Sequence, residues 1–215
     1  MVRVALGARL PDPAPRPASL PRPLDFHTQM PRFATPPADY ARSQAALELP
    51  HPPPAGAALL VAALLESQLL KEREQLAGAL LEMLDDSFGL PEVRLALVDR
   101  PQTHSTDQRG RLAQKTYGYY RCRIARPGAD PERCAIRIYH RTAVRGQALA
   151  PGAFVNTLLH EWTHHFDFSA LRLSRSPHTA GFFARLRWLA GAVGASPRIS
   201  SAPTLPLPLR GPAPR

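Results

Sequence analysis

The chain has 215 residues, enough for one domain of ordinary size, and 25 of them are prolines. Its formal net charge is +10, which favours DNA or another acidic partner. Nearly all of the positive charge comes from arginine, so we give the net charge only modest weight as a sign of function. The longest apolar stretch, residues 55–65, is too short to cross a bilayer. We therefore expect a cytoplasmic protein that has no membrane partner.

Proline-rich sequence lies at both ends of the chain. Residues 1–54 contain PDPAPRPASLPRPL and ELPHPPP, a composition that cannot bury enough apolar surface to offset the entropy of ordering the chain. Residues 196–215 have the same character. The sequence thus predicts one folded domain at 55–195, flanked by a disordered arm at 1–54 and a disordered tail at 196–215.

The first element predicted within that domain is a helix. Leucines recur at roughly helical intervals between Gly56 and Asp86, with charged residues between them. Gly89 and Pro91 then interrupt the pattern, as is usual just beyond the end of a helix. This spacing predicts one long amphipathic helix.

Strands and two further helices follow. Alternating apolar residues predict strands at 92–99 and 134–141, and a third strand within 113–124. Pro151 and Gly152 then break the chain before a helical stretch that is rich in histidine, and apolar spacing predicts a last helix over 180–193. Helices and strands in this order predict an α+β fold.

The stretch LLHEWTHHFDF, residues 158–168, has the spacing of a metal-binding helix. His160 and His164 would lie one turn apart, about 6 Å, so that both imidazoles can reach one ion. Glu161 would lie beside them, where a carboxylate can accept a proton from a metal-bound water. The opposite face of this helix would be an apolar stripe of Val155, Leu159, Trp162 and Phe166.

A catalytic zinc ion with two histidine ligands needs a third protein ligand and keeps a fourth position open. Three residues downstream are candidates. His165 would point away from the pair as a partly exposed helix residue, and Asp167 would have to fold back along its own helix. His178 follows a break in the pattern and can approach from another side. We favour His178 as the third ligand and keep Asp167 as the alternative, with a role in holding an imidazole N–H as its more natural use.

A function of a different class fits the same residues. Structural zinc sites are usually closed by four protein ligands. If both Asp167 and His178 bound the ion, the site would be closed, and a non-enzymatic, basic, DNA-associated protein would be favoured. If only His178 joined the pair, hydrolysis would be favoured.

The segments HEWTHHFDF and SPHTAGFFARLRWL together resemble the SprT-like (Spartan-type) zinc metallopeptidases of the gluzincin-like HExxH group. In that family a third histidine precedes an aromatic residue by four positions and opens a helix, and His178 and Phe182 match this pattern. The specific match covers about residues 153–189. The chain departs from the family pattern because a proline-rich tail, rather than a cysteine-rich zinc ribbon, follows the matched part.

The resemblance implies a small zincin-like fold with a long N-terminal helix, a three-stranded sheet, the HExxH helix and a further C-terminal helix. It implies a Zn²⁺ metallopeptidase in which His160, His164 and His178 hold the ion and Glu161 acts as general base. A protein or peptide would be the substrate, and an Arg-rich surface would suit DNA association. In zincins generally a sheet edge holds the substrate as an added strand, and AIRIYHRTA, residues 135–143, is the edge that we expect.

Overall fold

The structure is a computed structural model, and it describes residues 37–125 and 129–195. These residues belong to one compact unit that begins at Thr35. The sequence-based predictions for residues 1–36 and for the tail at 196–215 lie outside the described residues.

The described residues form five helices and five strands in a mixed α+β order. The helices are α1 (Pro37–Ala45), α2 (Ala55–Glu66), α3 (Leu70–Phe88), α4 (Pro151–Ser169) and α5 (Ala180–Ala192). The strands are β1 (Arg94–Pro101), β2 (Thr103–Thr106), β3 (Leu112–Thr116), β4 (Gly118–Ile124) and β5 (Pro131–Arg141). The predicted α+β class is confirmed, and none of the described helices is long and apolar enough to cross a membrane.

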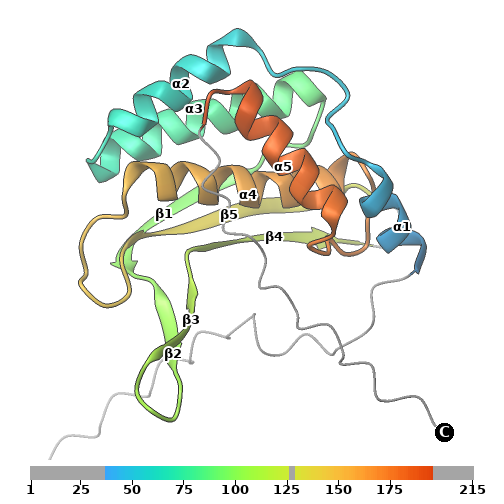
Figure 1. Cartoon of the computed structure of the whole chain (residues 1–215). Coiled ribbons are helices and arrows are strands. Elements are labelled where there is room, and N and C mark those ends of the chain that lie inside the picture. The colour runs from blue at the N-terminus through green and yellow to red at the C-terminus, as the bar shows by residue number, and fades with distance from the viewer. Residues whose placement is uncertain (1–36, 126–128, 196–215) are drawn as a thin grey trace, which may run out of the picture. The chain divides into compact units, whose positions relative to one another are not determined.

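Three strands form one sheet in the order β1-β5-β4, and β2 pairs with β3 in a separate ribbon that projects from this sheet (Figure 1). β1 runs parallel to β5, with Leu97 opposite Ile138, whereas β4 runs antiparallel to β5, with Tyr120 opposite Ile136. β5 is therefore the central strand of the sheet. The prediction that residues 135–143 form a sheet edge is wrong, because both sides of β5 are paired and β4 and β1 are the edges.

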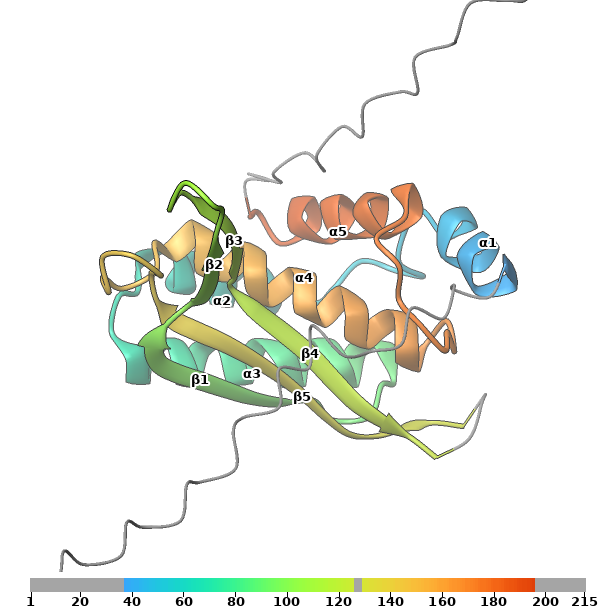
Figure 2. The ribbon, with the colours of Figure 1, turned by 90° about the horizontal axis from the view of Figure 1, so that it is seen from below.

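Helices α2 to α5 lie on one face of the three-stranded sheet, as the views from the side and from below agree (Figures 1 and 2). α4 lies directly against β4 and β5, and α2 and α5 pack on it. Its apolar stripe is buried as predicted: Val155, Leu159, Trp162 and Phe166 are each at most 2% exposed. The indole of Trp162 donates to the carboxylate of Asp85 on α3 at 2.9 Å. The other face of α4 is left for polar residues.

The long helix predicted between Gly56 and Asp86 is wrong in one respect: the chain breaks it into α2 and α3. Ser67 and Leu69 are extended at the break, and Leu69 is 71% exposed although it continues the apolar repeat. The fully buried guanidinium of Arg73 donates to the carbonyl of Ser67 from Nε at 3.3 Å and from Nη2 at 2.9 Å. A buried donor from the next helix thus satisfies a carbonyl that the break leaves free.

The predicted boundary of the folded domain at residue 55 is also wrong, because α1 and the segment after it pack onto the fold. Ser43 of α1 is fully buried, and Leu49 is 5% exposed in the main core. The backbone of α1 lies directly against Gly181 at the start of α5, where an added Cβ would stand 2.0 Å from the carbonyl oxygen of Ser43. This contact fixes α1 beside α5.

We predict that Gly181→Ala destabilises the protein, because the methyl group would meet backbone rather than a flexible side chain. Overpacking of this kind costs about 1–3 kcal/mol of unfolding free energy. Gly191→Ala on the same helix is the matched control: its Cβ would meet nothing within 4 Å, and the change should raise the unfolding free energy by up to about 1 kcal/mol. Chemical denaturation measures both, and equal stability of Gly181→Ala and the parent would contradict the packing described.

Candidate metal centre

Three histidines converge beside α4. His160 and His164 project from consecutive turns of this helix, and His178 comes from the loop between α4 and α5. The Nε2 atom of His178 lies 3.1 Å from Nε2 of His160 and 3.1 Å from Nε2 of His164. One ligand atom from each ring lies within 4.8 Å of the others, so these residues are close enough to hold a metal ion.

Hydrogen bonds among the rings do not account for this convergence. A neutral imidazole carries one N–H, so Nε2 of His178 has at most one proton for two neighbouring nitrogens. In a tetrahedral zinc site with Zn–N bonds of about 2.05 Å, ligand nitrogens stand about 3.3 Å apart. The separation of 3.1 Å is close to that value. The geometry fits three nitrogens arranged around one cation.

The two helix histidines lie in surroundings that keep them neutral. Burial lowers the pKa of His160 to about 4, with the neighbouring His178 adding to the effect. Burial likewise holds the pKa of His164 well below its usual value, helped by His160 and His178. Because a neutral imidazole presents a lone pair, both rings are ready to bind a metal without first losing a proton. His178 is exposed at the open side of the cluster.

The ring of Phe182 packs against all three imidazoles of the histidine cluster. Its ring centroid lies 5.1 Å from that of His160, 4.6 Å from that of His164 and 5.0 Å from that of His178, and the side chain is fully buried. The side-chain oxygen of Thr179 accepts from the backbone N–H of Phe182 and caps α5 at this point. A single rigid side chain therefore restricts all three imidazoles at once.

Asp167 faces away from the cluster and reaches it through Ser176. The carboxylate is fully buried: Oδ1 accepts from Arg185 at 2.7 Å and Oδ2 accepts from the Ser176 hydroxyl at 2.8 Å. Since the Ser176 hydroxyl donates to Asp167, its oxygen is free to accept from Nδ1 of His164, which lies 2.7 Å away. This chain places the proton of His164 on Nδ1 and leaves Nε2 as the lone-pair nitrogen that faces His178.

Helix α1 anchors the loop that carries His178, a role that sequence reasoning missed. The carboxylate of Asp39 accepts from the backbone N–H of Ser174 at 2.8 Å, and the Ser43 hydroxyl lies 2.9 Å from that of Thr179. Asp39 and Ser43 lie in a short segment that is flanked by prolines and lacks apolar periodicity. The only sequence signal is that two polar residues four apart share a helix face, which is too common to predict a contact.

Glu161 is buried between α4 and the edge strand β4. It is 6% exposed, and burial raises its pKa to about 8, against the effect of a hydrogen bond from the backbone of Tyr120. The contact places the Glu161 carboxylate beside the unpaired edge of the sheet. A carboxyl group whose pKa lies near neutrality can both accept and return a proton at physiological pH.

His165 differs from the prediction that it is partly exposed. It is fully buried, its Nε2 lies 2.9 Å from the carbonyl oxygen of Pro91, and its Nδ1 lies 3.1 Å from the Tyr120 hydroxyl. Burial lowers the pKa of His165 to about 4, so its contact at 3.5 Å with Asp85 is not an ion pair at neutral pH. This histidine ties α4 to the sheet and is not part of the metal cluster.

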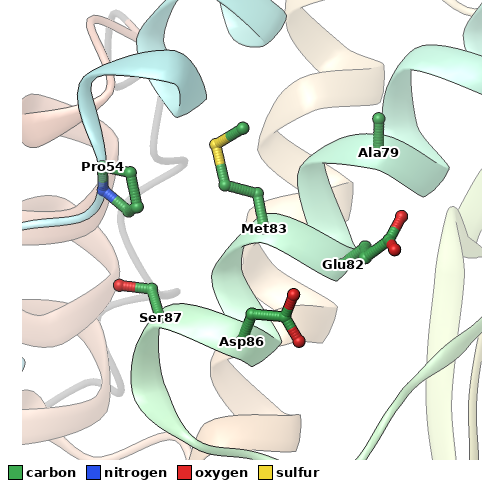
Figure 3. A pocket seen from close by; sticks show the side chains of 6 residues that line it. All are labelled: Pro54, Ala79, Glu82, Met83, Asp86 and Ser87. Atoms are coloured by element: carbon green, nitrogen blue, oxygen red, sulfur yellow. The ribbon is translucent and has the colours of Figure 1, made fainter.

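A separate open pocket of about 560 Å³ lies along α3, lined by residues that precede the histidine cluster in the sequence. Figure 3 shows the side chains that line it. Its lining includes Met83 and the carboxylates of Glu82 and Asp86. None of its lining residues belongs to the histidine cluster.

We predict that Ser176→Ala weakens metal binding while leaving all three histidines in place. Loss of the hydroxyl removes the acceptor that fixes the tautomer of His164, and changes of this kind typically lower metal affinity about 10- to 100-fold. Ser169→Ala is the matched control, because its hydroxyl contacts the non-cluster histidine His165 at 3.3 Å. Competition with a chromophoric chelator measures the affinities; equal zinc affinity of the two variants would refute the positioning role.

Comparison with known proteins identifies no relative of this chain. No family model matches it, and no match is found among curated proteins or among solved structures. The resemblance to SprT-like metallopeptidases therefore stays a prediction from the sequence. What supports a function is the arrangement of the chain's own residues.

Proposed function

We propose that this protein is a zinc-dependent metallopeptidase. His160, His164 and His178 hold the ion, and Glu161 is the general base. The observation that carries the proposal is the approach of three Nε2 atoms to one point at a helix packed against a sheet edge, with the buried carboxyl group of Glu161 on the same helix. A helix of this kind under a small mixed sheet is also compatible with a zincin-like fold.

Zinc is the metal that suits this donor set. Three neutral imidazoles are typical ligands of catalytic zinc, which keeps its fourth position for water or substrate. When bound, the ion would lower the pKa of a water molecule and polarise a carbonyl group. Glu161 would take the proton from that water and later give it to the leaving amine.

The position of Asp167 favours hydrolysis over a structural zinc site. Both of its oxygens are occupied by Arg185 and Ser176, and the metal-binding group found among the described residues consists of three histidines alone. A closed, four-ligand site would need a further donor from the protein. The alternative of a non-enzymatic, DNA-associated protein with structural zinc therefore has less support.

The edge strand β4 is the part of the sheet that we expect to hold a peptide. Its other side pairs with β5, and the backbone of Tyr120 contacts Glu161, so the free edge runs past the candidate general base. An extended peptide added to this edge would bring its carbonyl groups near the histidine cluster. β4 takes the place that we assigned to residues 135–143 from the sequence.

An association with DNA is a further part of the proposal. The exposed residues Arg94 and Arg121 lie opposite Ala135 from the two sides of the sheet, so they share one face, and Arg137 lies on the same face two residues on. The described helices cover the other face (Figure 2). An arginine-rich surface of this kind suits a phosphate backbone.

We predict one zinc ion per chain in the purified protein, measured by plasma mass spectrometry. His160→Ala and His178→Ala should each lose most of it, because each removes one of three ligands. His104→Ala, which changes an exposed histidine on β2, is the matched control and should keep the full amount. Zinc retained in His178→Ala would remove His178 from the ligand set, and a parent that binds no zinc after reconstitution would refute the proposal.

We predict that Glu161→Gln keeps its zinc and loses hydrolysis. Loss of a positioned general base lowers a rate by about 10²- to 10⁴-fold. The test is cleavage of unfolded protein substrates by zinc-loaded parent and variant, with and without single-stranded and double-stranded DNA. Cleavage by the variant at the parental rate would show that Glu161 is not the base, and a zinc-loaded parent that cleaves nothing would favour the structural-zinc alternative.

A further inference from the structure

A pocket of about 340 Å³ lies at the amino-terminal end of α4 and is not explained by the metal site. It opens to solvent and is lined by residues of the β1–β2 junction, of β3 and of the loop that joins β5 to α4. Its polar lining is made of Gln102, Lys115, Tyr117, Thr142, Arg145 and Gln147, and no carboxylate lines it. Every one of these side chains can donate a hydrogen bond, and two are cations.

A buried donor in this lining has no partner. Gln102 is 3% exposed, and its Nε2 atom makes no hydrogen bond with any described residue. Buried amide groups rarely remain unpaired, and Gln102 is one of the residues that line the pocket, so this donor is available to an acceptor that a ligand brings. The cations of the pocket, Lys115 and Arg145, are exposed and form no ion pair with a described residue. The Lys115 ammonium lies 4.7 Å from the centroid of the Tyr117 ring.

The start of α4 adds two backbone donors to the same place. Ala150 is the N-cap and Pro151 follows it, so the first turn has no side-chain cap, and it contains no acidic residue. The N–H groups of Gly152 and Ala153 have no acceptor among the described residues. Ala150 and Ala153 both line the pocket. A helix amino terminus carries partial positive charge and attracts oxyanions, which the unpaired Gln102 donor would also meet.

The pocket lies in line with the histidine cluster along α4. Ala153 and His160 are seven residues apart, which puts them on the same helix face about 10 Å apart along the axis. Between them the methyl group of Thr157 packs against Gly118 at the start of β4, where an added Cβ would lie 3.0 Å away. A peptide extended along β4 covers about 10 Å in three residues.

We propose that this pocket is a subsite that binds an oxyanion on the peptide substrate, three or so residues from the bond that is cut. The inference rests on the proposed peptidase function for the identity of the ligand. The oxyanion is the carboxylate of an acidic residue or the phosphoryl group of a phosphorylated residue. Both offer the negatively charged acceptor that the donors of the pocket lack.

The first test is direct and needs no activity. Acetate and inorganic phosphate are titrated separately into the isotope-labelled full chain, with chloride at matched ionic strength as the control. We expect saturable shifts in the amide signals of Gly152 and Ala153 and in the side-chain amide of Gln102. The double variant Lys115→Ala and Arg145→Ala should bind both anions at least about tenfold more weakly, because hydrogen bonds to charged groups are the strong ones. Absence of saturable shifts with both anions would overturn the proposal.

The second test uses zinc-loaded full chain and a mixture of unfolded-protein peptides, with and without phosphorylated residues. The parent should cut preferentially where an acidic or a phosphorylated residue stands at one fixed distance from the bond. Whether acidic or phosphorylated peptides predominate among those cut tells whether the pocket binds a carboxylate or a phosphoryl group. In the double variant this preference, taken as the ratio of cleavage of anionic to non-anionic peptides in the same mixture, should fall roughly tenfold.

The outcomes separate the two hypotheses. Cleavage without any anionic preference would overturn the subsite and leave the peptidase proposal intact. Saturable anion binding by a zinc-loaded parent that cuts no peptide would refute the peptidase and, with it, the assignment of the anion to a substrate. If the amide signals of Gly152 and Ala153 shift with an oligonucleotide but with neither anion nor peptide, the subsite proposal is overturned and the pocket is a nucleic-acid-binding site instead.

Discussion

The buried ion pair between Arg185 and Asp167 is the interaction on which the candidate site depends. Both side chains are fully buried and 2.7 Å apart, and Arg185 also donates to the carbonyl oxygen of Ser43 at 2.9 Å. Burial raises the pKa of Asp167, and the guanidinium opposes that rise. Removing one member of such a pair typically costs about 3–5 kcal/mol, because the other is left as an uncompensated buried charge. The pair thus joins α5, α4 and α1, and through Ser176 it reaches His164.

The sequence predicts the parts of this arrangement that are local. The spacing of His160 and His164 and the apolar stripe opposite them depend on one helix, so periodicity is enough to place them. The contacts of α1, by contrast, join residues more than a hundred positions apart, such as Ser43 and Thr179. The break at Ser67 depends on a donor from Arg73, and the central position of β5 depends on which strands pair. Neither the contacts of α1 nor the strand pairing has a signature in the local sequence, and the Ser67–Arg73 hydrogen bond, although it joins residues six positions apart, follows no periodic pattern.

Two arginines are fully buried among the described residues, so part of the positive charge is not available at the surface. Arg73 donates to the carbonyl of Leu149 at 2.7 Å, just before α4 begins, while Arg185 binds Asp167 near its other end. The site helix is therefore held at both ends by guanidinium groups that solvent does not reach. Part of the positive charge that suggests an acidic partner therefore lies inside the fold, where it binds other groups of the protein. Exposed arginines of the described residues, among them Arg94 and Arg121, remain available to such a partner.

Anchoring α4 at both ends has a consequence for the chemistry along it. His160, Thr157 and Ala153 share one face, and this face meets the start of β4, where an added Cβ at Gly118 would lie 3.0 Å from the methyl group of Thr157. Because helix and strand are in contact there, the distance between the histidine cluster and the amino-terminal pocket is set by the backbone rather than by flexible side chains. A ligand that spans both must match a fixed length. Specificity from such a spacing needs no movement of the protein when the ligand binds.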